Sequence, residues 1–182
     1  MAVIGWGKPR IFIKDLDASA PKWEELTTPA EDSTQLTTTK GDKQEAKIEG
    51  GENEDVKYGK NTYALALNIR AAKGRKRPVS DSDGVVAHNY AVVVQPEDPE
   101  VQGFCMEKTT VSVEDTFDSA GGGIWAYTFD ALKAAADKKQ IQWGKIIVTE
   151  SGGNISKIEC DPEDESGDGD KFEVAPNPSV GG

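Results

Sequence analysis

An alternation of apolar and polar residues with a period of two recurs along this chain and constrains its fold more than any other feature. The segment 63–70 places large apolar residues at every second position, and in 110–117 Val111, Val113 and Phe117 alternate with polar residues. Because successive side chains of a strand point to opposite faces, this pattern is typical of half-buried antiparallel strands. The segment 85–95 is apolar on both faces, which predicts a central strand covered on both sides. The sequence therefore predicts a mainly β fold, an antiparallel β-sandwich or barrel with long inter-strand loops.

Helix signals are concentrated in one segment. The alanine-rich run from Asp130 to Lys139 has the best intrinsic helix propensity in the chain, and Asp130 is a suitable N-cap. Lys138 and Lys139 would face the negative end of the helix dipole. We expect one short helix near 130–139.

The composition favours one domain with a thin core. Of the 182 residues, 36% are hydrophobic and 29% are charged. We expect a single β domain over 1–175 and a flexible tail over 176–182. No apolar stretch approaches the roughly 20 residues that span a bilayer, and the N-terminus lacks a signal-peptide pattern, so no membrane association is expected. Cys105 and Cys160 are expected to be reduced and buried in strands.

The charge is unevenly distributed. The net charge is -11, and the segment 159–173 holds eight acidic residues against the single Lys171. This acidity argues against binding nucleic acid by neutralising phosphates. It is compatible with a surface past which DNA slides without adhering.

A charged strand and two charged loops are the most distinctive local features. In 43–49, Lys43, Glu45, Lys47 and Glu49 alternate on one face, which is typical of a strand whose outer side meets water or a charged neighbour. We expect this strand to pair with one that begins near Asn61, through a mobile acidic connector at 50–55. The basic segment 73–78 joins two further strands.

The sequence contains no combination of residues that predicts a catalytic or cofactor-binding site. His88, the single histidine, is expected in mid-strand with a structural role. The segment 51–61 fails as a phosphate loop because its glycine spacing is too long and Asn61 replaces the magnesium-binding Ser or Thr. Three acids offer a weak calcium candidate, but Ala175 stands where an EF-hand needs a bidentate glutamate. These acids are Asp164, Asp168 and Asp170.

The order of these features resembles the major tail-tube proteins of long-tailed phages and the related tubes of contractile injection systems. The resemblance rests on the N-terminal run 5–12, the Thr-rich segment 32–41, the hairpin 43–70 and the aromatic segment 122–129 before a single helix. It implies a β-sandwich or barrel, hexameric rings that stack into a tube, and DNA that passes through without specific binding. It also implies tape-measure, tail-terminator and baseplate partners, and assembly of the virion tail in the host bacterial cytoplasm.

The resemblance makes the charged strand and loops candidates for contacts between subunits. These candidates are Lys43, Glu45, Lys47, Glu49, Glu52, Glu54, Asp55, Arg75, Lys76 and Arg77. The segment 17–34, an extended arm or loop, is a further candidate.

Two alternatives remain. One is a β-sandwich module that binds carbohydrate or protein through an exposed tryptophan, the other a small hydrolase that uses carboxylates. The tryptophans are Trp6, Trp23, Trp125 and Trp143.

Overall fold

The computed structural model describes residues 5, 7–135, 137–162 and 170–178. This part of the chain is built of strands joined by turns and loops, and no helix occurs in it. The mainly β, antiparallel fold predicted from the sequence is confirmed. The strands are β1 (Arg10–Asp15), β2 (Trp23–Glu25), β3 (Gln35–Thr39), β4 (Lys43–Lys47), β5 (Asn53–Tyr58), β6 (Thr62–Arg70), β7 (Tyr90–Gln95), β8 (Gly103–Asp118), β9 (Gly122–Ala131), β10 (Gln142–Ser151), β11 (Asn154–Asp161) and β12 (Phe172–Glu173).

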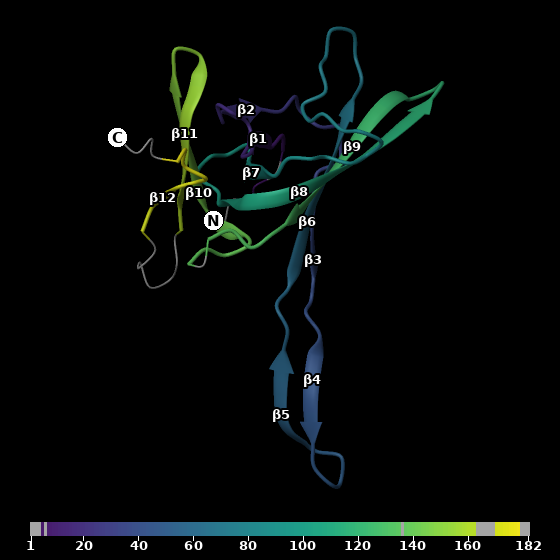
Figure 1. The fold of residues 1–182 in the computed structure, drawn as a ribbon, viewed down its shortest axis with the longest axis vertical. Helices are drawn as coiled ribbons and strands as arrows, with labels where there is room; N and C mark the ends of the chain where they lie inside the picture. Colours follow the sequence, from purple (N-terminus) through teal and green to yellow (C-terminus); the bar gives the residue numbers. More distant parts are fainter. Residues whose placement is uncertain (1–4, 6, 136, 163–169, 179–182) are drawn as a thin grey trace.

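The long strand β8 organises a curled ten-stranded sheet that resembles half a barrel. Its first part pairs with β7 on one side and with β10 on the other. Its second part pairs with β9, which continues the sheet through β6 to β3. Strands β4 and β5 form a separate two-stranded sheet that projects from the body (Figure 1).

Two apolar clusters lie on opposite faces of the central strands. In β7, Val92 and Val94 belong to one cluster, whereas Ala91 and Val93 belong to the other. The first cluster unites β1, β6, β7, β8 and β9, and the second adds residues of β10 and β11. The central, doubly covered strand is therefore confirmed, but it begins at Tyr90 rather than near residue 85. Residues 85–89 form an irregular lead-in instead.

The helix predicted near 130–139 is wrong. Strand β9 continues to Ala131, which pairs with Thr109 of β8, and the Leu132 amide still donates to the Lys108 carbonyl. Sheet pairing thus uses the residues that would begin the helix. The remaining alanine-rich stretch is shorter than the roughly 12 residues that a helix needs without tertiary support. Apart from residue 136, which is not described, it forms turns and loops.

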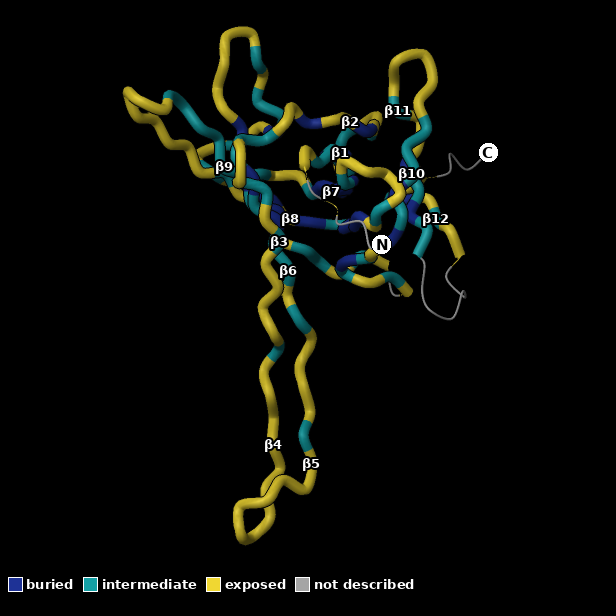
Figure 2. Tube along the Cα trace, turned by 180° about the vertical axis from the view of Figure 1, so that it is seen from behind, coloured by how far each residue is buried: buried dark blue, intermediate teal, exposed yellow. Residues whose placement is uncertain are grey.

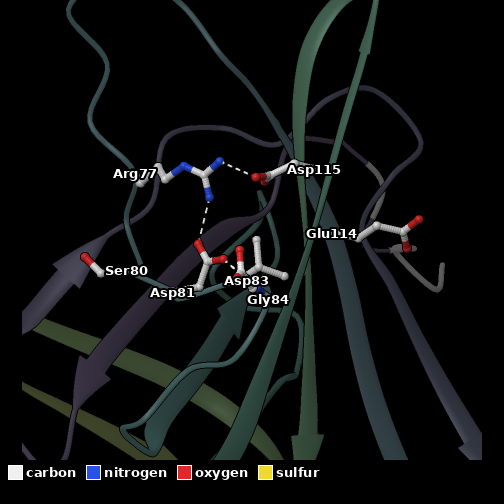
Figure 3. Close-up of a pocket in the computed structure, with 8 residues that line it drawn as sticks. Arg77, Ser80, Asp81, Asp83, Gly84, Glu114 and Asp115 are labelled. Carbon is white, nitrogen blue, oxygen red and sulfur yellow. Dashed lines mark hydrogen bonds and ion pairs between the residues drawn. The ribbon is translucent and has the colours of Figure 1, made fainter.

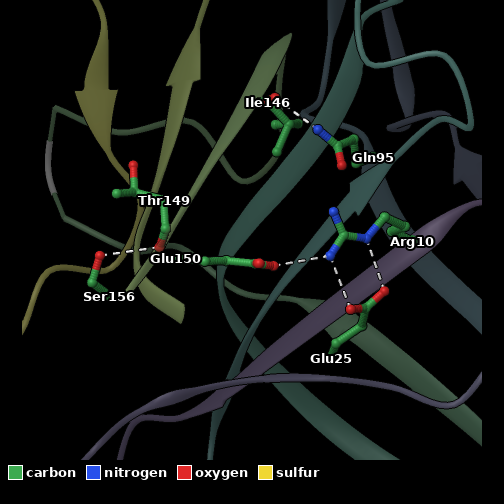
Figure 4. A network of polar contacts seen from close by, with 7 residues as sticks. All are labelled: Arg10, Glu25, Gln95, Ile146, Thr149, Glu150 and Ser156. Carbon is green, nitrogen blue, oxygen red and sulfur yellow. Dashed lines mark hydrogen bonds and ion pairs between the residues drawn. The ribbon is translucent and has the colours of Figure 1, made fainter. Parts of the chain in front are cut away.

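A polar network links several strands of the body (Figure 4). The Arg10 guanidinium donates to both carboxylate oxygens of Glu25, at 2.9 and 3.0 Å, and to Glu150 at 3.2 Å. Nearby, the buried Gln95 amide donates to the Ile146 carbonyl at 3.0 Å. These contacts join β1, β2 and β7 to β10.

The two cysteines are buried and do not form a disulfide with each other, as predicted. Cys105 lies in β8 and Cys160 in β11, and both belong to the second apolar cluster. Residues 179–182 of the predicted tail lie outside the described residues.

Candidate assembly surface

The projecting hairpin, residues 40–61 and hereafter the arm, is the most exposed part of the described chain (Figure 2). Strands β3 and β6 form the base from which the arm projects, and β4 and β5 form the shaft of the arm. At about 3.3 Å per residue, the nine steps from Thr39 to Ile48 carry the tip roughly 30 Å beyond the base. All five residues of β4 are exposed, and in β5 only Val56 is half-buried.

The shaft lacks a core of its own. Among the described strands, β4 and β5 make their only extensive contact with each other. An isolated two-stranded hairpin is marginally stable at best in water, because it cannot bury enough apolar surface. The arm therefore has the properties of a segment that awaits a partner surface.

The charged strand β4 pairs with a different strand from the one predicted. β4 pairs with β5, with Lys43 opposite Tyr58, rather than with the strand that begins near residue 61. That later strand, β6, pairs with β3 instead. The segment taken as a connector therefore provides a short turn at 48–52 and the start of a second exposed strand.

One face of β4 carries an internal charge ladder. Glu45 forms ion pairs with both Lys43 and Lys47, the latter at 3.6 Å. The hydrogen bond from Lys43 lowers the pKa of the Glu45 carboxyl. Because directly opposite residues share a face, Tyr58 lies beside Lys43, and its side chain is 63% exposed. Tyr58 was not predicted from the sequence, because an aromatic residue in a short polar strand gives no periodic signal.

The junction between shaft and base is tightly packed. The Gly59 amide donates to the Asp42 carbonyl at 2.8 Å, and the Gly41 amide donates to the Asn61 side chain at 3.2 Å. A Cβ atom on Gly41 would overlap the backbone of Gly59 and Lys60. A glycine is therefore required at position 41 for the two strands to approach this closely.

The tip of the arm is acidic. Residues 48–55 contain four acidic residues and no lysine or arginine. Gly50 and Gly51 adopt positive φ angles of 100° and 88°, which allow the tight reversal between the strands. The exposed Ile48 adds an apolar contact point beside these carboxylates, with 47% of its surface accessible.

The basic segment projects from the end of the body opposite the arm, beside the β8–β9 hairpin (Figure 1). Its four cations are Lys73, Arg75, Lys76 and Arg77. Arg75 donates to the Arg70 carbonyl and so braces the start of the loop. The structure thus places the two groups of predicted interface residues at opposite ends of the molecule rather than together.

Arg77 serves an internal role (Figure 3). Its guanidinium donates to Asp81 at 2.8 Å and to Asp115 of β8 at 2.6 Å, and it lies 5.1 Å from the centroid of the Trp125 ring. The Asp115 hydrogen bond raises the pKa of Arg77. Arg77, Asp81 and Asp115 line an open recess of about 590 Å³ together with Asp83 and Glu114. The guanidinium of Arg77 therefore has its carboxylate partners within its own chain.

The β8–β9 hairpin forms a second projection (Figure 1), which was not predicted from the sequence. Phe117 near its tip is 80% exposed. The Asp118 carboxylate accepts hydrogen bonds from the amides of Ala120 and Gly121 and so fixes the turn. The alternation predicts Phe117 on the apolar face of its strand, but the pattern continues past the point where the core ends, and Phe117 faces solvent.

The remaining candidate residues do not gather into a chemical site. His88 lies in a loop rather than in mid-strand, and its Nδ1 is 2.8 Å from Asp15, which raises the pKa of the imidazole. Asp164 and Asp168 lie outside the described residues, whereas Asp170 is exposed. Within the described ranges, no group of three or more His, Cys, Asp or Glu side chains could hold a metal ion.

The candidate tryptophans differ in exposure. Trp23 is buried and Trp125 is half-buried, whereas Trp6 lies outside the described residues. Trp143 is 48% exposed and packs against Phe104, with ring centroids 5.0 Å apart. In the part of the chain that the structure describes, no helix is long and apolar enough to cross a membrane.

No protein-family model matches the chain, and no curated protein sequence matches it.

Proposed function

We propose that this chain is the subunit of a phage tail tube, which self-assembles into stacked hexameric rings and forms a conduit for the genome. The observation that supports this proposal most strongly is the arm. It extends roughly 30 Å beyond its base and has no core of its own. Such a hairpin becomes stable when a neighbouring surface covers it.

Free edges of the ten-stranded sheet also support the proposed self-assembly. The ten-stranded sheet has three terminal strands, β2, β3 and β12, which each pair with a neighbour on one side only. Unpaired edges invite uncontrolled association, and a closed ring of subunits removes them. Edge-to-edge pairing around a ring would therefore satisfy two of these three edges in each subunit.

The proposal assigns a structural role to the protein and no catalytic role. Its partners would be further copies of the same chain, with tape-measure, tail-terminator and baseplate proteins at the ends of the tube. DNA would pass through the lumen without specific binding.

The test is direct assembly of purified protein. Light scattering and negative-stain microscopy over a range of protein and salt concentrations should reveal rings or tubes. A chain that stays monomeric under all of these conditions contradicts the proposal.

A binding module is the second candidate, and the exposed Trp143 favours it. An indole that is half exposed and packed on Phe104 could stack on a sugar ring or on a protein side chain. Screening on a glycan array distinguishes this candidate, since binding that is lost on Trp143→Ala supports it and absence of binding removes its carbohydrate form.

A further inference from the structure

The arm tip and the basic loop carry matching charges of opposite sign. The tip, residues 48–55, holds four acidic residues and no basic one, whereas the basic loop, residues 71–79, holds four basic residues and no acidic one. The two segments lie at opposite ends of the long axis of the molecule (Figure 1). A single copy therefore cannot bring its own tip to its own loop.

The tip carboxylates are available for a partner. Glu49, Glu52 and Glu54 are exposed, and within the described residues none of them forms an ion pair. The nearby lysines are already engaged, because Lys43 and Lys47 both pair with Glu45. The lysines of β4 are thus engaged within their own strand, and the four acidic residues of 48–55 leave negative charge concentrated at the tip.

The basic loop likewise presents exposed charges that a partner can contact. Lys73 and Lys76 are exposed, and among the described side chains they have no ion-pair partner. Arg75 and Arg77 hold the loop in place through Arg70 and through Asp81 and Asp115. The loop is therefore braced on one side and presents two unpaired ammonium groups on the other.

We propose that the acidic tip of one copy binds the basic loop of the next copy along the long axis. This inference rests on the proposed self-assembly and names the surfaces that join successive rings. One tip and one loop on each copy make a head-to-tail contact, which repeats without closing and so builds a filament or stack. The ends of such a stack keep one free tip or one free loop.

A second copy fits the loop better than nucleic acid does. The formal charge of the tip equals that of the loop with the opposite sign, and the whole chain is strongly acidic. Phosphate binding needs a basic face, which an acidic chain with one four-cation loop does not offer. Both surfaces are solvent-exposed, so salt should weaken their attraction, since the Debye length falls to about 3 Å at 1 M.

Charge-swap variants of the full chain test the inference. The tip variant carries Glu49→Lys and Glu52→Lys, and the loop variant carries Lys73→Glu and Lys76→Glu. We expect each variant alone to lose end-to-end assembly while it keeps its circular dichroism spectrum. Each pair of changes brings the net charge of its segment from four to zero. A 1:1 mixture should assemble again, and so should a chain that carries all four changes, because the lysines placed at positions 49 and 52 then meet the glutamates placed at positions 73 and 76.

A matched control separates this effect from net charge. Lys133→Glu with Lys139→Glu changes two exposed lysines elsewhere and should assemble as the wild type does. Normal stacking of the tip and loop variants overturns the inference, and so does failure of the four-fold variant to recover. A loop variant that stacks normally but loses retention on double-stranded DNA assigns the loop to nucleic acid instead. A wild-type chain that never assembles contradicts the proposed function itself.

Discussion

The body and the arm of this protein are both antiparallel β-structure, yet they are stabilised in opposite ways. The body buries two apolar clusters on opposite faces of its central strands, where Phe12, Leu67 and Phe129 are fully inaccessible. In the arm, the shaft strands have no buried residue. The same backbone pairing thus produces a self-sufficient unit in one place and a dependent one in the other, because apolar burial supplies most of the stability of a sheet.

The largest effect should come from the body. Phe129→Ala removes a ring that is completely buried in the first cluster, and we expect it to cost about 3–5 kcal/mol of unfolding free energy. Urea denaturation followed by circular dichroism measures this loss. Tyr58→Ala in the arm is the matched aromatic control, and a comparable loss there would show that the arm is not independent of the core.

The junction should give the next largest effect. Gly41→Ala forces a Cβ into the backbone of Gly59, whereas a Cβ on Gly59 comes no nearer than 3.3 Å to its neighbours. We expect Gly41→Ala to cost about 1–3 kcal/mol locally through overpacking, and to reduce assembly more than Gly59→Ala does. Hydrogen exchange of the β3 and β6 amides, together with light scattering, measures both effects. Equal behaviour of the two variants would contradict this account of the junction.

The Arg10 network predicts an acid sensitivity of the body. The Arg10 hydrogen bond holds the pKa of Glu25 below its ordinary value of 4.5. A carboxyl with a lowered folded-state pKa stabilises the fold above the unfolded pKa, and this contribution is lost as the pH falls through the folded value. Because both side chains are partly exposed, we expect a contribution of at most about 1 kcal/mol.

Urea midpoints measured from pH 6 down to pH 3 test this sensitivity. Glu25→Gln should flatten the acid dependence of the wild type, while Glu24→Gln, which changes the neighbouring carboxylate, should leave it in place. The same slope in both variants would place the acid sensitivity elsewhere.

The smallest effect should come from the charge ladder of the shaft. Glu45→Ala removes two ion pairs on the surface of an exposed strand, and we expect the unfolding midpoint to stay unchanged within experimental error. Thermal unfolding monitored by circular dichroism checks this expectation. A larger loss would mean that the shaft contributes to the stability of the whole chain.

The sequence predicted the strands that bury one face or both. Alternation located β6 and the second half of β8, and a continuous apolar run located the central strand β7. These predictions succeeded because burial itself creates the pattern. The charged strand β4 was also recognised, since its lysines and glutamates alternate.

The failures occurred where burial does not determine structure. β5 has the sequence Asn-Glu-Asp-Val-Lys-Tyr and no apolar face, so only pairing with β4 makes it a strand. The helix near 130–139 failed because pairing of Ala131 with Thr109 outweighed the local propensity of the alanines. The separation of the charged loops to opposite ends depends on how the sheet curls, which local patterns do not specify.

The central claim is that the arm serves assembly and not the folding of its own body. Deletion of residues 42–59 leaves Lys40, Gly41, Lys60 and Asn61 as a four-residue loop between β3 and β6, a length common in hairpins. Urea denaturation and negative-stain microscopy of this variant, beside the wild type, test the claim most directly. We predict an unchanged unfolding midpoint and a complete loss of tubes. Tubes that still form from the shortened chain, or a body that no longer folds, would contradict it.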